Sequence, residues 1–406
     1  MRRSNVRTEP RKIALVLPFP TPSGRELTEL PRFRRESALA GELRARGFAV
    51  EGFKATRGSE RVSSVDDSGT PWHFLPAKAD AAPALSEDAQ GAAHLLRSPH
   101  LVQEVSAWQP DVVLVKGAGT RIGQDLAQRT DAYFGVIIGG RFKDASLFDC
   151  DVILTETVAQ DRYLSRFGLG RRLLRLPKLP HAAFLSEVSR TDLELSYDIA
   201  VVSKFVASKN HQALEPLFDH PLRIVMMGDG PLRTTLEQAA AGRTAEVVFT
   251  GNVSQSDVAG FVGRSRLLVH PARYEGFPRA LVEAMALGVP AISLRGVVGE
   301  PIIHGKNGLL VPEGDLVRET LRVLDDASEL RILGENAKRT QQSHFTLAAL
   351  QRTADSLAER IRTDSRAHAS RPIRCRRGSS IRVVLWRSWR PVERAVKHLR
   401  TAATPG

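Results

Sequence analysis

Cysteine and aromatic residues are scarce in this sequence. Only Cys150 and Cys375 occur, far apart and without neighbouring metal ligands, and Phe, Trp and Tyr make up 6% of the 406 residues. Two isolated cysteines exclude a disulfide framework and a zinc site as the basis of the fold, and they fit a reducing compartment. We therefore expect a cytoplasmic chain that is held together by hydrophobic cores and binds no metal.

Long hydrophobic runs are missing as well. The apolar segment after the basic N-terminus, residues 13–17, is too short for the core of a signal peptide and far too short to span a bilayer. Hydrophobic residues nevertheless make up 42% of the chain and charged residues 25%, as in ordinary globular proteins. A globular chain of 406 residues is expected to form two domains.

The net charge of +13 is unevenly distributed along the chain. Residues 362–406 contain twelve Lys or Arg and two acidic residues, so this segment alone carries +10. The remainder is nearly neutral and contains no recognisable nucleic-acid-binding motif, so the charge predicts no nucleic-acid partner for the body of the protein.

Segments of strand length alternate with helical segments in both halves of the chain. The predicted strands are residues 12–20, 48–55, 110–119 and 150–157 in the first half, and 197–205, 222–230, 245–253, 265–272 and 289–294 in the second. Helices are predicted between them, for example at 34–47, 211–218 and 279–288. This alternation is typical of parallel sheets covered by helices, and it predicts an α/β fold of two Rossmann-like domains that face a cleft.

The most informative segment is EGFPRALVE, residues 275–283, which follows a predicted strand. Gly276 and Pro278 form a bend whose backbone can approach a ligand, and the next helix directs free N–H groups toward an anion. Glu275 lies on the loop and Glu283 two turns into the helix, and carboxylates accept hydrogen bonds from sugar hydroxyls. The pattern therefore predicts a site for a phosphate and a carbohydrate, although two glutamates alone are more often surface charges.

This segment resembles the signature of the retaining glycosyltransferases of family 4, a Glu followed by seven residues and a second Glu. The resemblance implies the GT-B fold, with the donor sugar held by Glu275, Gly276, Phe277 and Pro278 and the donor ribose held by Glu283. It also implies attack on the face from which the leaving group departs, with a phosphate oxygen taking the acceptor's proton. The nucleoside-diphosphate sugar is then a co-substrate, and no other cofactor is implied.

Two lysines lie in the loop of VVSKFVASKNH, residues 201–211. The family has Gly-Arg-Leu followed by a Lys in the corresponding segment, and both cations hold the diphosphate. Here Lys204 replaces the Arg, which keeps the charge but loses bidentate geometry, and Lys209 occupies the position of the Lys. The resemblance implies that Lys204 and Lys209 stabilise the departing diphosphate, so that no metal is required.

Three further segments resemble loops of the family's donor site: MGDGPLR at 227–233, TGNVSQSDV at 250–258 and GVVGEPIIHGKNGLLVPEGD at 296–315. The resemblance implies that Gly228, Gly230 and Val253 pass the nucleoside and that Glu300 closes the donor site. Taken alone, these segments have the composition of ordinary turns.

The sequence indicates less about the acceptor site than about the donor site. Many family members carry a His in the middle of the first domain, where this chain has Lys116 and Gly117. Either Lys116 or backbone N–H groups take the role of that His, or the acceptor is handled differently. In the first loop Gly24 leaves room for an acceptor and Arg25 can meet an acidic one, and an ordinary surface loop is an equal alternative.

Two patterns mimic other ligand sites. Gly117, Gly119 and Gly123 resemble a dinucleotide fingerprint, but they lie in the middle of the domain and the third Gly is displaced by one position, so NAD binding is not expected. Asp149-Cys150-Asp151 mimics a DxD metal motif, but it precedes a predicted strand and is therefore expected at the edge opposite the site.

These assignments divide the chain into an acceptor-side domain (1–185), a nucleotide-sugar-binding domain (186–345), a helix that braces the N-terminal domain (346–365) and a basic tail (366–406). The tail mixes Arg and Lys with Trp386 and Trp389. That mixture suits an anionic membrane surface at the inner face of the cytoplasmic membrane, and a disordered solubilising tail is the alternative.

The sequence thus predicts an enzyme that transfers a sugar from a nucleoside-diphosphate sugar to a glycan or lipid-linked acceptor with retention of configuration, in cell-surface polysaccharide or glycolipid synthesis. The missing His and the change from Arg to Lys motivate an alternative. In that alternative the chain is a catalytically silent GT-B protein that binds nucleotide sugars or serves as a scaffold.

Overall fold

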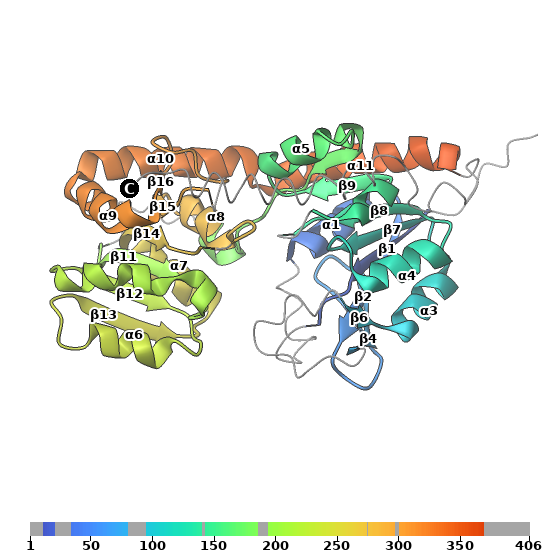
Figure 1. The fold of residues 1–406 in the computed structure, drawn as a ribbon. Helices are drawn as coiled ribbons and strands as arrows, with labels where there is room; N and C mark the ends of the chain where they lie inside the picture. The colour runs from blue at the N-terminus through green and yellow to red at the C-terminus, as the bar shows by residue number, and fades with distance from the viewer. Residues whose placement is uncertain are drawn as a thin grey trace, which may run out of the picture. The chain divides into compact units, whose positions relative to one another are not determined.

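The structure is a computed structural model that describes residues 11–20, 34–79, 95–139, 143–185, 194–273, 275–296 and 300–368. Gly24, Arg25 and the basic tail beyond residue 368 lie outside these residues. The chain forms two compact units: Met1–Leu176 with Gln351–Gly406, and Pro177–Leu350 (Figure 1). No helix in the described part of the chain is long and apolar enough to cross a bilayer.

The first unit is built on an eight-stranded sheet with the order β10-β9-β8-β7-β1-β2-β4-β3. Its neighbours are parallel except for the β3–β4 pair at one edge. The strands are β1 (Lys12–Leu17), β2 (Ala49–Thr56), β3 (Val62–Val65), β4 (Pro71–Pro76), β7 (Val112–Lys116), β8 (Tyr133–Ile137), β9 (Val152–Thr155) and β10 (Leu173–Arg175). A small antiparallel pair, β5 (Lys78–Ala79) and β6 (Leu96–Arg97), lies outside this sheet.

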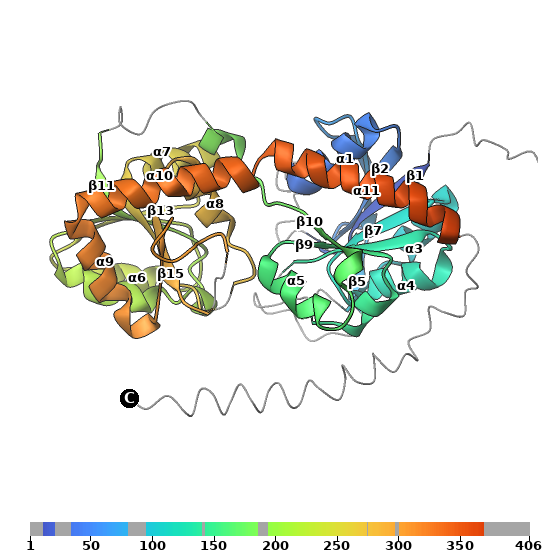
Figure 2. The same ribbon diagram turned by 90° about the horizontal axis from the view of Figure 1, so that it is seen from above.

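Helices cover both faces of the first sheet. The helices α3 (Pro99–Trp108), α4 (Arg121–Arg129) and α5 (Val158–Ser165) pack on one face, and α1 (Arg34–Ala45) lies on the other (Figure 2). The helices α3, α4 and α5 each have a Ser or Thr at the N-cap. The side-chain oxygen of this residue accepts a hydrogen bond from a backbone N–H in the first turn of the helix. The connection from β8 to β9 differs, because its described residues contain only the five-residue 3-10 helix η2 (Ala145–Asp149).

The C-terminal helix α11 (Leu347–His368) begins in the second unit, and from Gln351 onward it belongs to the first. It lies beside α1 (Figure 2), where Asp355 accepts a hydrogen bond from Arg46 (2.7 Å) and Gln351 donates one to Glu42 (2.9 Å). The Thr353 hydroxyl donates to the carbonyl of Arg175 at the edge strand β10 (2.6 Å). A segment from the end of the chain thus completes the first unit.

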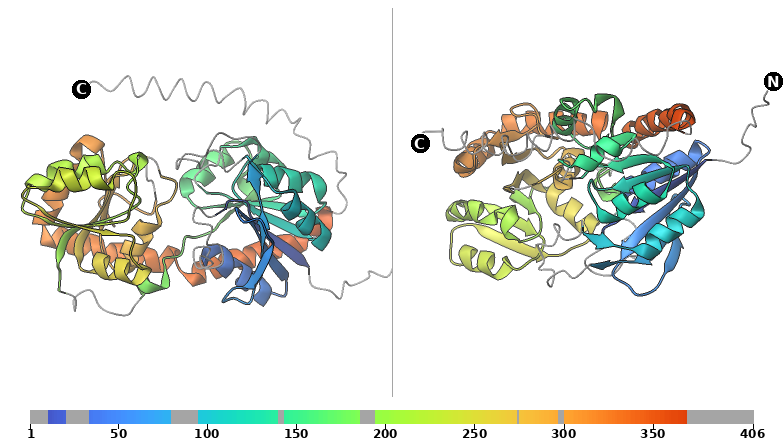
Figure 3. Two further views of the ribbon diagram at one scale, coloured as in Figure 1. Left: turned by 90° about the horizontal axis from the view of Figure 1, so that it is seen from below. Right: turned by 45° about the vertical axis from the view of Figure 1, so that its right-hand side comes forward.

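The second unit has a six-stranded, fully parallel sheet with the order β13-β12-β11-β14-β15-β16. Its strands are β11 (Tyr197–Val202), β12 (Arg223–Met227), β13 (Glu246–Gly251), β14 (Ser265–His270), β15 (Ala291–Leu294) and β16 (Leu309–Val311). The helices α7 (Gln255–Gly263) and α8 (Arg279–Ala286) cover one face, and α6 (Arg233–Ala240) and α9 (Leu316–Asp325) cover the other (Figure 3). The helix α10 (Ala327–His344) follows α9.

The helical segment predicted at 211–218 is a 3-10 helix, η7 (His211–Asp219), and not an α-helix. Pro216 lies inside it, and proline has no N–H to give to an α-helical hydrogen bond. The tighter turn still buries Leu214, Leu217 and Phe218 in the core of the second unit.

Candidate functional site

The carboxyl ends of β11 and β14 lie side by side in the second sheet, because these strands are parallel neighbours with Ile199 opposite Leu267. Ligands of open parallel sheets bind at this end. The loop after β11 carries Lys204 and Lys209, and the loop after β14 carries Glu275. The ammonium of Lys209 forms an ion pair with the Glu275 carboxylate, whereas Lys204 is exposed to solvent. The structure thus brings together two of the three predicted catalytic residues.

A residue that the sequence did not single out joins these two loops. Asn210 has a left-handed backbone conformation with φ of 55°, and its side-chain amide donates to the carbonyl of Pro271 (3.1 Å) and to Glu313 (3.2 Å). The backbone N–H of Arg273 donates back to the carbonyl of Ser208 (3.2 Å). These bonds fix the Lys209 loop against the Glu275 loop.

A buried histidine lies beneath the ion pair. His270, at the end of β14, is 4% exposed, and its Nε2 lies 3.7 Å from Glu275 Oε2. Within the described part of the chain this nitrogen has no hydrogen-bond partner. Burial lowers the pKa of His270 to about 4; Glu275 opposes the shift and Lys209 adds to it. A neutral imidazole is therefore available as a donor to the Glu275 carboxylate.

His211 is the second neutral histidine near this end of the sheet. Its Nε2 lies 2.8 Å from the Ser203 hydroxyl, and its ring packs edge-on against Phe205. Burial lowers its pKa to about 4, and the charge of Lys209 contributes. It supports the loop that carries both lysines.

These two histidines predict a loss of stability on acidification. The folded chain keeps both rings neutral down to about pH 4, while the unfolded chain protonates them near pH 6.5, so the unfolded state binds more protons between these values. Stability should therefore fall as the pH drops from about 6.5 to about 4, with a slope of up to about 1.4 kcal/mol per pH unit for each ring. Urea unfolding across this range measures it, with the His211→Gln/His270→Gln double variant as reference. An equal pH dependence in both chains would contradict the assignment.

The helix α8 presents the other predicted acidic residue. Glu283 is 5% exposed and forms an ion pair with Arg279 (3.1 Å). Burial raises its pKa, while Arg279 and a backbone hydrogen bond from His181 act in the opposite direction. Pro278 occupies the N-cap position of α8 without a capping side-chain bond, and Phe277 packs against Phe345 in a small buried cluster. Phe277 therefore anchors the bend, and its ring does not line an open site.

The glycines after β12 have a structural reason that the sequence did not reveal. Gly228 and Gly230 have φ of 136° and 156°, and a Cβ on either would collide with the carbonyl oxygen of Ser203 or Phe205. The backbone of this loop also accepts hydrogen bonds from the N–H groups of Ser203 and Phe205. Both glycines therefore allow the loop that carries Lys204 and Lys209 to pack closely against the loop after β12. Their contact with a nucleoside stays a prediction.

The remaining predicted donor residues lie on nearby loops of the second unit. Val253 follows β13 and packs partly against the core, and Glu300 is half-buried and precedes a cis peptide bond with Pro301.

In the first unit, Lys116 at the end of β7 belongs to a charged network. Its ammonium lies 2.9 Å from Glu36, which also binds the buried Arg35 (2.7 Å), and Arg35 reaches Glu156 (2.5 Å). Burial alone raises the pKa of Glu36, but the charges of Arg35 and Lys116 outweigh it and hold this pKa below its ordinary value. Gly117 packs against Phe19 with φ of 94°. The network fixes the Lys116 side chain.

The Asp149-Cys150-Asp151 sequence has a structural role. A carboxylate oxygen of Asp151 accepts the backbone N–H of Phe134 (2.9 Å), and the buried Cys150 thiol has a raised pKa because burial disfavours the thiolate. Over the described ranges, no group of three or more His, Cys, Asp or Glu side chains is arranged to hold a metal ion.

Residues 191–340 match the model of the family "Glycosyl transferases group 1". The matched residues, called the group 1 domain below, lie within the second unit. The group 1 domain contains the whole Lys209–Glu275 site, whereas the match does not extend over the first unit.

Relatives confirm this placement over parts of their length. The chain is 33% identical to an uncharacterized glycosyltransferase of Methanocaldococcus jannaschii over 143 residues, which cover 34% of this chain and 41% of the relative. It is 30% identical to the GDP-mannose-dependent alpha-mannosyltransferase of Corynebacterium glutamicum over 172 residues, 39% of this chain and 40% of the relative. The chain thus matches less than half the length of these curated relatives.

Solved structures share the fold over most of the chain. Sucrose-phosphate synthase from Thermosynechococcus elongatus has a TM-score of 0.65 at 17% identity and covers 87% of this chain and 100% of its own. Anabaena HepE in complex with UDP-glucose has a TM-score of 0.61 at 16% identity, with 86% and 99% covered. The two Rossmann-like units therefore have the GT-B fold, as the sequence predicted.

Proposed function

We propose that this protein transfers a sugar from a nucleoside-diphosphate sugar to a glycan or lipid-linked acceptor, with retention of configuration. The observation that carries the proposal is the ion pair between Lys209 and Glu275 at the carboxyl edge of the group 1 domain. Two loops 66 residues apart in sequence meet there, one cationic and one acidic, as the recognition of a diphosphate and a sugar requires.

In the proposed reaction the donor's diphosphate competes with Glu275 for Lys209. As the bond between the anomeric carbon and the diphosphate breaks, the leaving group gains negative charge, which Lys209, Lys204 and the N-terminus of α8 stabilise. The acceptor hydroxyl oxygen bonds to the anomeric carbon, and its proton passes to a phosphate oxygen. The Glu275 carboxylate, released from Lys209, is free to accept hydrogen bonds from the sugar hydroxyls and from His270.

The two lysines supply the positive charge that a divalent cation provides in other glycosyl transfer sites, so we propose that the reaction is metal-independent. Cytoplasmic location and peripheral attachment through the basic tail rest on the sequence alone, because residues 369–406 lie outside the described part of the chain.

The test is the binding and slow hydrolysis of UDP-, GDP- and ADP-sugars, each compared with its free nucleotide. Glu283→Ala should weaken binding of the free nucleotide about tenfold or more, because the ribose loses its acceptor. Glu275→Gln should not weaken binding of the free nucleotide, because it removes the charge that competes with the diphosphate for Lys209, and it should abolish the additional affinity that the sugar provides. Glu335→Gln, on the exposed surface of α10, is the matched control. If both site variants bind and turn over donors like the parent, the assignment is wrong.

One observation favours a catalytically silent protein instead. Lys116, where many family members carry a His, forms an ion pair with the buried Glu36. Its ammonium is therefore not free to take the role of that His. A silent protein would bind one of the nucleotide sugars without hydrolysing it or transferring the sugar to any acceptor, so turnover separates the two readings.

A further inference from the structure

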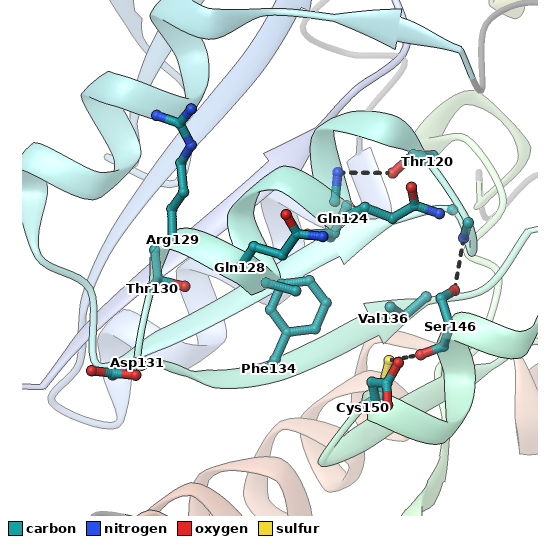
Figure 4. Close-up of a pocket in the computed structure, with 16 residues that line it drawn as sticks. Thr120, Gln124, Gln128, Arg129, Thr130, Asp131, Phe134, Val136, Ser146 and Cys150 are labelled. Atoms are coloured by element: carbon teal, nitrogen blue, oxygen red, sulfur yellow. Dashed lines mark hydrogen bonds between the residues drawn. The ribbon is translucent and has the colours of Figure 1, made fainter. Parts of the chain in front are cut away.

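A groove of about 720 Å³ lies on the face of the first sheet beside α4 (Figure 4). The connection from β7 to β8 contains the helix α4, whereas the described residues of the next connection, from β8 to β9, form only the short η2. The sheet face over β8 is therefore left without a full helix. We call this the α4 groove, and its principal lining residues are Gln124, Gln128, Phe134, Val136, Ser146 and Asp149.

The two glutamines of α4 are the main polar groups of the α4 groove. Gln124 and Gln128 are four residues apart, so they lie on the same side of the helix, and Figure 4 shows both carboxamides beside the groove. Neither carboxamide has a hydrogen-bond partner among the described residues. Each offers a donor and an acceptor, which is the combination that binds a sugar hydroxyl in either direction.

The remaining lining fits a neutral, hydroxyl-rich ligand. Phe134 and Val136 form an apolar floor that can cover the C–H faces of a sugar ring. Asp131 and Asp149 are the acidic residues of the lining, and Arg129 points away from Phe134 in Figure 4. The carboxylates disfavour a phosphate. The volume lies in the range of about 300–1,000 Å³ that is typical of small-molecule sites.

The α4 groove begins where the acceptor is expected. One end is lined by Gly117 and Gly119, directly after Lys116 at the carboxyl end of β7, and the other end by Thr130 and Asp131 before β8. We infer that the α4 groove binds a neutral oligosaccharide, the part of a glycan acceptor that lies away from the reacting hydroxyl. This inference rests on the proposed function for the identity of the acceptor.

Binding of neutral oligosaccharides to the full chain, without any nucleotide, tests the inference. Maltotetraose, mannotetraose and chitotetraose are the probes, followed by saturation-transfer NMR and calorimetry. At least one should bind the parent, and the Gln124→Ala/Gln128→Ala variant should bind it at least tenfold more weakly. Gln128→Trp, at an exposed position, should block the groove to a similar extent. Gln238→Ala on α6 is the control, and UDP, GDP and ADP affinities should not change.

The outcomes separate this inference from the proposed function. If a nucleotide binds the parent but no oligosaccharide does, or if oligosaccharide binding survives in both groove variants, the α4 groove is not a glycan site. If an oligosaccharide binds and the groove variants lose it while no nucleotide sugar binds or turns over, the α4 groove stands and the proposed transferase activity fails.

Discussion

Replacing Lys209 with Ala should lower kcat/KM for the sugar donor by about 100- to 1,000-fold, because a preorganised charge that stabilises the leaving group is worth about that much. Lys209 is half-buried and is held in the loop that Asn210 fixes, so its ammonium is already positioned for the diphosphate. The loss should appear mainly in kcat, since the charge on the diphosphate grows as the bond breaks. Steady-state hydrolysis of the donor that binds in the nucleotide-sugar panel measures it.

Two other lysines provide the comparison for Lys209→Ala. Lys204→Ala should have a smaller effect, because this side chain is exposed and has no positioning contact with Glu275. Lys338→Ala, at an exposed position of α10 in the same unit, should have none. A Lys209→Ala enzyme as active as the Lys338→Ala control would mean that another group holds the leaving diphosphate.

Replacing Gly228 with Ala should destabilise the second unit by about 3–5 kcal/mol. The new Cβ would collide with the carbonyl oxygen of Ser203, and φ of 136° is itself unfavourable for an L-residue. Ser203 directly precedes the loop that carries Lys204 and Lys209. A backbone movement that relieves the clash should therefore also move Lys209 away from Glu275. Urea unfolding at neutral pH, with the donor affinity of the folded fraction, measures both effects.

Gly242→Ala separates the clash from the backbone strain. Gly242 has φ of 71°, and a Cβ there would meet nothing within 4 Å, so this variant should cost only about 1 kcal/mol. Equal stability losses for the two variants would show that the close approach of the β12 loop to Ser203 is not what requires glycine at position 228.

The sequence predicted strands that their apolar residues mark, among them β7 (Val112–Lys116) and β11 (Tyr197–Val202). It missed strands that only their neighbours in the sheet identify. Strand β8 contains Gly135, which weakens a strand pattern, yet a Cβ there would overlap Leu114 and Val152 of the adjacent strands. Strand β4 begins and ends at Pro, Pro71 and Pro76, and its pairing with β2 and β3 identifies it.

The sequence predicted those residues of the candidate site that belong to a contiguous motif. EGFPRALVE pointed to Glu275 and Glu283, and the position after a strand pointed to Lys209. The sequence did not indicate residues whose partners are distant along the chain. Asn210 donates a hydrogen bond to a carbonyl 61 residues away, and Arg35 donates one to Glu156, 121 residues away. His270 ends the strand β14 that precedes the motif, but only the fold shows that its buried nitrogen lies near Glu275.

The return of α11 to the first unit has a consequence for synthesis of the chain. Residues that hold Arg46, Glu42 and the end of β10 leave the ribosome only after all of Pro177–Leu350 has been made. A nascent chain that stops near residue 346 would contain nearly every residue of the second unit. The first unit of that chain would still lack α11. The half of the protein that is translated first is therefore the half that finishes folding last.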